Sequence, residues 1–206
     1  MSDLARLEQQ VTFLREMDRL KSVIRQTQLL SADRRENTAE HSWHIAMGAL
    51  TLAEYAPDGT DIARAVKLLL IHDIIEIDAG DTYAYDVEGH IDKYEREAAA
   101  ARRIFGLLPD EQRDIYIALW EEFEHIETTD AKFANAIDQL LPTLYNTWND
   151  GGSWSERNPT YEQVFARSQR RLGDSGADAI WDYVQKLIAD AVAKGWLATP
   201  TTDNAQ

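Results

Sequence analysis

The chain contains no cysteine among its 206 residues. This absence excludes disulfide bonds, thiolate nucleophiles, and zinc or iron–sulfur sites that are built on cysteine. Any metal ion that the protein binds must therefore be held by histidine, aspartate or glutamate side chains together with water.

Positive charge is also scarce, with 21 Lys and Arg residues against 36 Asp and Glu residues and a net charge of −15. Binding to nucleic acid requires clustered Lys and Arg side chains that displace counterions, so we expect no nucleic-acid partner. A small phosphate ligand remains compatible with this charge, because a metal ion or local positive charge can hold it against an acidic background.

Long hydrophobic runs are missing as well. The longest apolar stretch, at residues 63–75, is interrupted by Arg64, Lys67, His72 and Asp73. It is too short and too charged to span a bilayer. The first ten residues lack the basic start and the apolar run of a secretory signal. We therefore expect a cytoplasmic protein without a membrane partner.

The alternation of Val, Ile and Thr that is typical of β-strands is nearly absent, and apolar residues instead recur every three or four positions. The sequence therefore predicts an all-α protein in one domain. Thr38 is expected to be the N-cap of the second helix. The predicted helices cover approximately residues 2–21, 38–52, 60–72, 89–105, 109–123, 129–144, 161–172 and 177–193. Loops are expected at 31–37, 78–88 and 149–159, and a frayed tail at 199–206.

Some charged side chains lie where the predicted helices are apolar. His72 and Asp73 end the most apolar helix, and Asp138 lies among alanine, isoleucine and leucine residues. A buried carboxylate needs a counter-charge, a hydrogen bond or a metal ion. Taken singly, Asp138 has an ordinary explanation as a structural aspartate, and His41, near a helix start, as a surface or core histidine.

Taken together, His41, His72, Asp73 and Asp138 supply two imidazoles and two carboxylates from three helices. This combination predicts a mixed nitrogen–oxygen site for one divalent ion, with Mn, Co, Fe, Ni, Zn and Mg as candidates. Four protein ligands leave two positions of an octahedral ion open for a water molecule and a substrate oxygen. The pattern therefore predicts metal-assisted hydrolysis of a phosphate ester.

Two further carboxylates follow the His72-Asp73 pair. Glu76 lies four residues after His72, so a continuing helix would place it on the same side. There it could orient or deprotonate the attacking water; the alternative is an exposed helical carboxylate. Asp81 lies on the loop just beyond and could assist the water or the leaving oxygen.

The order and spacing of several short motifs resemble the HD-domain superfamily of metal-dependent phosphohydrolases, and within it the 5′-deoxynucleotidase branch. These motifs are Glu40-His41-Ser42, His72-Asp73-Ile74-Ile75-Glu76, Gly80-Asp81, Ala131-Lys132-Phe133 and Asp138-Gln139. The resemblance covers about residues 13–146. It implies a helical bundle, usually a homodimer, that hydrolyses nucleoside 5′-monophosphates, preferentially deoxy, to nucleoside and phosphate.

The resemblance also implies roles for single residues. The positions that match metal ligands are His41, His72, Asp73 and Asp138. Glu76 matches a water-activating carboxylate and Asp81 a second catalytic carboxylate. Arg25 matches an arginine that binds the substrate phosphate, and its planar donors suit phosphate oxygens; a solvated arginine at a helix end is the alternative.

The sequence departs from this family in two places. Gln26 stands where an aromatic residue often shapes the sugar pocket, and its amide could accept a ribose 2′-hydroxyl, which puts a strict deoxy preference in doubt. The chain also continues past the matched core of about residues 13–146, with predicted helices over about 155–195. This C-terminal extension could cover the bundle or mediate dimerisation.

Three alternatives stay open at this point. A di-iron oxygenase of the HD type would need extra histidines near the doublet, but none occurs between Asp73 and His90. A catalytically idle nucleotide-binding module would need neither Glu76 nor Asp81. A hydrolase of triphosphates or alarmones fits less well, because Arg25 is the single candidate phosphate arginine.

Overall fold

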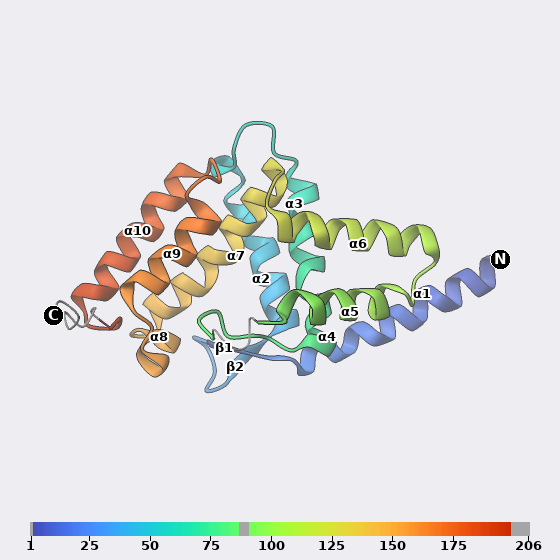
Figure 1. Cartoon of the computed structure of the whole chain (residues 1–206), viewed down its shortest axis with the longest axis horizontal. Coiled ribbons are helices and arrows are strands. Elements are labelled where there is room, and N and C mark those ends of the chain that lie inside the picture. The colour runs from blue at the N-terminus through green and yellow to red at the C-terminus, as the bar shows by residue number, and fades with distance from the viewer. Residues whose placement is uncertain (1, 87–90, 199–206) are drawn as a thin grey trace.

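The computed structural model describes residues 2–86 and 91–198. Over these residues the protein is an all-α bundle with one small two-stranded sheet, which confirms the predicted fold class (Figure 1). In chain order the elements are α1 (Asp3–Met17), β1 (Ile24–Gln28), β2 (Arg35–Asn37), α2 (Thr38–Thr51), α3 (Ile62–Ile71), α4 (Glu76–Ala79), α5 (Lys93–Phe105), α6 (Asp110–His125), α7 (Thr129–Trp148), α8 (Gly152–Arg157), α9 (Tyr161–Leu172) and α10 (Asp178–Ala193). Short 3-10 helices occupy Asp18–Ser22, Ala53–Tyr55 and His72–Ile75.

Helix α7 runs through the middle of the bundle. It packs against α2, α3 and α6 from the preceding part of the chain, and against α9 and α10 from the following part (Figure 1). Its side chains Phe133 and Ile137 are fully buried, and each such side chain contributes about 2–3 kcal/mol of hydrophobic stabilisation. Asp138 follows Ile137 directly, so the helix that forms the core also carries a candidate ligand.

Helix α2 begins one residue away from the prediction. Asn37, and not Thr38, is its N-cap: the Asn37 side chain accepts a hydrogen bond from the Glu40 backbone N–H, and the Glu40 carboxylate accepts one from the Asn37 N–H. This reciprocal pair satisfies two N–H groups at the helix start. The Thr38 hydroxyl is thereby left available for a contact elsewhere.

Two predicted loops contain regular structure. Residues 35–37, inside the predicted loop 31–37, pair antiparallel with β1. Residues 152–157, inside the predicted loop 149–159, form α8, where Trp154 is 2% exposed and the Asn146 side chain accepts a hydrogen bond from the Ser153 backbone N–H. Both segments are too short to show a hydrophobic period in the sequence.

The helix at the N-terminus exposes the apolar stripe from which it was predicted. Leu4, Leu7, Val11 and Leu14 are each more than half exposed, and Phe13 is its buried contact with the bundle. Helix α5 starts at Lys93; the earlier part of the helix predicted from residue 89, and the tail at 199–206, fall outside the described residues. None of the described helices is both long and apolar enough to cross a bilayer.

Candidate metal centre and adjoining pocket

The structure brings the four predicted metal ligands together. His72 and Asp73 lie in the 3-10 turn that follows α3, while His41 comes from α2 and Asp138 from α7. His72 Nε2 lies 2.9 Å from an Asp73 oxygen and 3.7 Å from Asp138 Oδ1, which is itself 3.0 Å from His41 Nε2. Ligand atoms bound about 2.1 Å from one ion lie roughly 3–4 Å apart, so these spacings suit a shared cation.

The outer nitrogen of each imidazole lies beside an acceptor. His72 Nδ1 lies 2.9 Å from the carbonyl oxygen of Leu69, and His41 Nδ1 lies 3.4 Å from a Glu36 carboxylate oxygen. Both partners can only accept a hydrogen bond, so in the neutral imidazole the proton is on Nδ1 and the lone pair is on Nε2. Both histidines therefore present a ligand atom to the centre, held in the way that metal-binding histidines are usually held.

The electrostatics of the centre also favour a cation. Burial lowers the pKa of His72, but Asp73 and Asp138 outweigh it and raise the pKa to about 10. Burial raises the pKa of Asp138, yet hydrogen bonds to the two imidazoles hold it well below its usual range. Without a metal ion, the two carboxylates thus draw protons onto the imidazoles, and a divalent ion would displace those protons.

The two predicted catalytic carboxylates adjoin the centre. Glu76 is the first residue of α4, and the Thr38 hydroxyl donates a hydrogen bond of 2.8 Å to its carboxylate. Burial, together with the negative charges of Asp73 and Asp81, raises the pKa of Glu76 to about 8. The pKa of Asp81 is raised as well, mainly by burial. Glu76 can therefore hold or release a proton near neutral pH.

Arg25 of β1 lies against the acidic side of the centre. Its Nη1 is 2.9 Å from Asp73, 3.6 Å from Glu76 and 3.9 Å from Asp81, and its Nε is 3.5 Å from Glu36. Burial lowers its pKa, but the four carboxylates outweigh burial and raise it. Arg25 thus lies beside the centre and balances the charge of its acidic neighbours; its binding of a substrate phosphate stays a prediction.

Three charged residues at the centre were missed by sequence reasoning. Glu36 lies on a strand of three residues that was expected to be loop. Arg171 of α9 lies 3.7 Å from Asp138 Oδ2 and donates a hydrogen bond to Asn135. Arg167, one turn earlier on α9, lines the same cavity. The sequence contains one signal for the two arginines, a cluster of three arginines within residues 167–171 of an acidic chain. Such a cluster is equally typical of a helix face exposed to solvent.

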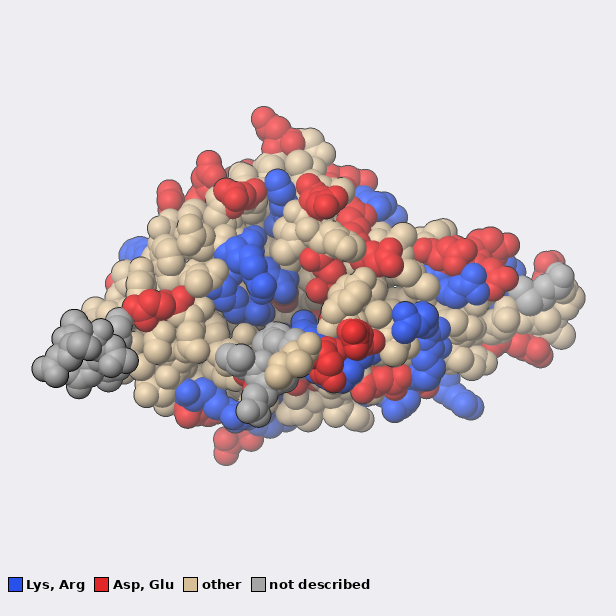
Figure 2. All heavy atoms as spheres, in the orientation of Figure 1, with Lys and Arg blue, Asp and Glu red and all other residues tan. Residues whose placement is uncertain are grey.

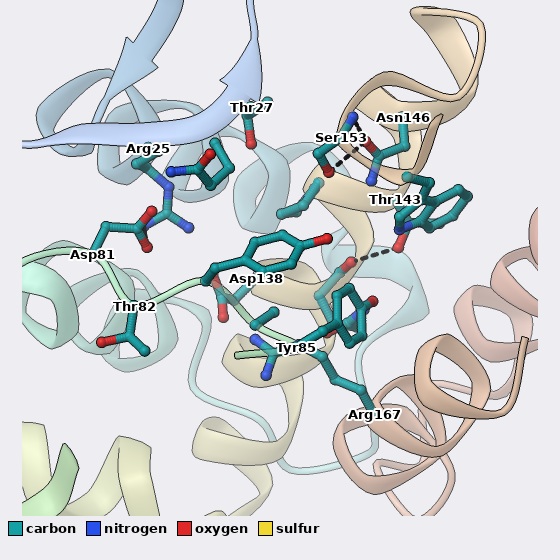
Figure 3. Close-up of a pocket in the computed structure, with 16 residues that line it drawn as sticks. Arg25, Thr27, Asp81, Thr82, Tyr85, Asp138, Thr143, Asn146, Ser153 and Arg167 are labelled. Atoms are coloured by element: carbon teal, nitrogen blue, oxygen red, sulfur yellow. Dashed lines mark hydrogen bonds and ion pairs between the residues drawn. The ribbon is translucent and has the colours of Figure 1, made fainter. Parts of the chain in front are cut away.

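A pocket of about 100 Å³ opens beside the centre (Figure 3). It is lined by residues of β1, of the loop after α4, and of α7, α8 and α9, including Arg25, Gln26, Asp81, Tyr83, Tyr85, Asp138, Gln139, Asn146, Trp154 and Arg167. Amides, hydroxyls and aromatic rings around a small cavity suit a polar ring compound. The C-terminal helices form one side of this pocket.

Gln26 lines the pocket with its amide oriented by two arginines. Its carbonyl oxygen accepts hydrogen bonds from Arg35 and from Arg157, the latter at 2.9 Å. The amide NH₂ therefore keeps its donors for other partners. The neighbouring rings of Tyr83 and Tyr85 meet edge to face, with centroids 5.4 Å apart.

The remaining histidines take no part in the centre where they are described. His44 Nδ1 lies 3.1 Å from the Tyr145 hydroxyl, and His125 is exposed near the end of α6 with Nδ1 at 2.7 Å from the Glu121 carbonyl oxygen. His90 lies outside the described residues.

Known proteins resemble this chain both in a family model and in single relatives. Residues 17–181 match a family model described as HD domain, which reaches past residue 146 to include α9. The human 5′-deoxynucleotidase HDDC2 is 33% identical over 128 residues, which are 62% of this chain and 61% of that protein. Its Xenopus laevis counterpart is 35% identical over half of each chain. The aligned part of this chain thus spans about three fifths or less of these relatives.

Solved structures resemble the chain over more of its length. A protein from Magnetospirillum magnetotacticum MS-1, described as a predicted metal-dependent phosphohydrolase, has a TM-score of 0.85 and 47% identity over 94% of this chain and 98% of its own. A conserved hypothetical protein from Pyrococcus furiosus has a TM-score of 0.60 at 21% identity, a likeness of fold alone.

Proposed function

The chain belongs to the HD-domain family, and from this premise we propose that it is a metal-dependent phosphohydrolase that converts nucleoside 5′-monophosphates into nucleoside and phosphate. The names of its relatives, 5′-deoxynucleotidase and metal-dependent phosphohydrolase, support this reaction class. The homodimer, the single domain over residues 1–206 and the cytoplasmic location remain predictions from the sequence.

The arrangement of the two imidazoles carries the proposal. His41 and His72 turn their Nε2 atoms toward two carboxylates, while each Nδ1 lies beside an acceptor. His41, His72, Asp73 and Asp138 would hold one divalent ion, of the first transition row or Mg²⁺. Such an ion supplies Lewis acidity toward the phosphoryl group and lowers the pKa of water.

The neighbouring carboxylates would handle the protons. In hydrolysis the water oxygen bonds to phosphorus, the bond from phosphorus to the 5′-oxygen breaks, and a proton moves from the water to that oxygen. Glu76, fixed by the Thr38 hydroxyl, is placed to take the proton from the attacking water. Its pKa falls when a cation occupies the adjacent ligands. Asp81, whose burial favours the protonated form, would give a proton to the leaving oxygen.

The pocket beside the centre would hold the nucleoside. Tyr83 and Tyr85 offer ring faces and edges, and the amides of Gln26 and Asn146 offer polar contacts. The free donors of Gln26 suit a ribose 2′-hydroxyl as acceptor. We therefore propose that ribonucleotides are accepted alongside deoxyribonucleotides.

One assay tests this function. Phosphate release is measured from ribo- and deoxyribonucleoside mono- and triphosphates with the metal-stripped protein, alone and after addition of Mn²⁺, Co²⁺ or Mg²⁺. The proposal expects release from monophosphates only when a metal is added, with ribo and deoxy substrates within about tenfold of each other. Release from triphosphates alone, or turnover in the metal-stripped protein, would refute it.

A further inference from the structure

Arg167 occupies a position shared by the catalytic centre and the pocket. It lines the pocket beside Tyr85, and it also lines the small cavity that is formed by His72, Asp73 and Glu76. Figure 3 shows its side chain reaching from α9 into the pocket. The guanidinium of Arg167 is therefore shared by the pocket and the catalytic cavity.

Within residues 2–86 and 91–198, Arg167 has no carboxylate partner in ion-pair contact, unlike Arg25 and Arg171. Arg170 and Arg171 follow it on α9, and burial together with Arg171 lowers the pKa of Arg167 to about 10, against the opposing effect of Asp138. Arg167 is half-buried, and a charge that is partly withdrawn from water without a partner is costly. Such an arrangement on the wall of a cavity is that of a site built for an anion.

The opposite wall cannot hold an anion as easily. Arg25 is in ion-pair contact with four carboxyl groups there, so part of its positive charge is already balanced within the fold. Arg167 offers unmatched positive charge across the same cavity, and in Figure 2 Lys and Arg atoms gather beside the hollow near α9. We propose that Arg167 binds the phosphate group of the substrate, so that the C-terminal helices complete the active site. This inference rests on the proposed function.

Arg170 provides a matched control. It lies on the same helix, is exposed, and lines a groove outside the pocket and the catalytic cavity. Arg170→Gln removes the same charge from the same helix without touching either cavity. Arg171 is unsuitable as a control, because it contacts the candidate ligand Asp138.

The test uses full-length protein loaded with Mn²⁺ and compares Arg167→Gln, Arg167→Lys and Arg170→Gln with the wild type. Calorimetry measures the Kd of inorganic phosphate and, separately, of a nucleoside; metal content and thermal unfolding are recorded for each protein. We expect Arg167→Gln to weaken phosphate binding roughly 10- to 100-fold. Arg167→Lys should recover part of the loss, while nucleoside binding, metal content and the Arg170→Gln protein stay unchanged.

Unchanged phosphate binding in Arg167→Gln, or an equal loss for phosphate and nucleoside, would overturn the inference. If Arg167→Gln does not fold, Arg167→Lys decides on the same readout, because a single ammonium cannot replace the bidentate contact; full wild-type affinity would then overturn it. Phosphate binding needs no turnover. A wild type that hydrolyses no nucleotide but binds phosphate through Arg167 would refute the proposed function alone.

Discussion

Arg25 and Arg167 face one cavity from opposite walls and from distant parts of the chain. On the acidic wall, Arg25 is matched by the carboxylates around it, and its charge is used within the fold. On the cationic wall, formed by Arg167 and Arg171 of α9, Arg167 is half-buried and has no ion-pair partner among the described residues. Arginine therefore balances charge within the fold on one wall, as Arg25, and is available for a ligand on the other, as Arg167.

Removing a ligand that touches both walls should have the largest effect. Asp138 lies against His41 on one side and Arg171 on the other. Asp138→Ala should lose the metal ion and lower kcat/KM on the order of 10³-fold or more, since several kcal/mol of transition-state stabilisation are lost. Metal analysis and phosphate release on the same sample check this, with exposed Asp182→Ala as the control. Retention of metal at the wild-type level would remove Asp138 from the ligand set.

A change confined to the acidic wall should separate chemistry from metal binding. Glu76→Gln keeps the shape of the side chain and its contact with Thr38 but cannot accept a proton as a base. We expect kcat to fall about 10²- to 10⁴-fold with metal content unchanged. Steady-state kinetics and metal analysis measure both quantities, and normal turnover would make Glu76 a bystander.

The two arginines should differ most clearly in stability. In the metal-free protein, Arg25→Gln leaves several buried carboxylates unbalanced and should lower the free energy of unfolding by roughly 3–5 kcal/mol. Arg167→Gln removes a half-buried cation that forms no ion pair within the described residues, so stability should stay the same or rise. Urea unfolding of both variants measures the difference. Equal losses in the free energy of unfolding would show that the two arginines do not differ in their structural role.

Metal binding should release protons. The raised pKa of His72, about 10, means that its imidazole is charged at pH 7 in the metal-free protein, whereas a ligand imidazole is neutral. Binding of Mn²⁺ should therefore release about one proton or more, and affinity should rise with pH up to that pKa. Calorimetry in buffers of different ionisation enthalpy counts the protons. A count of zero would contradict the charged state of His72.

The smallest expected effect concerns the sugar. Gln26→Trp replaces the amide donors with a bulky ring and should shift the ratio of kcat/KM values toward deoxyribonucleotides by a few-fold to about tenfold, the size of one lost hydrogen bond. Competition between a ribo- and a deoxyribonucleoside monophosphate measures this ratio. An unchanged ratio would place the 2′-hydroxyl away from Gln26.

The acidic wall could be predicted from the sequence because its residues break a pattern. Asp138 interrupts an apolar helix face, and the pair His72-Asp73 ends another, so both implied burial and a partner. Arg167 breaks no pattern, since an arginine on an amphipathic helix is ordinary. Its function depends on how α9 packs against α7, which is a tertiary contact. Glu36 was missed for a similar reason, because its strand is too short to be recognised.

The central claim is that His41, His72, Asp73 and Asp138 hold one ion that phosphate release requires. The most direct measurement determines metal per chain and phosphate release from a nucleoside monophosphate in the same preparation, before stripping, after stripping and after reloading. We expect one ion per chain, with activity lost and regained together with the ion. Full activity in the stripped protein, or two irons per chain with oxygen consumption, would contradict it.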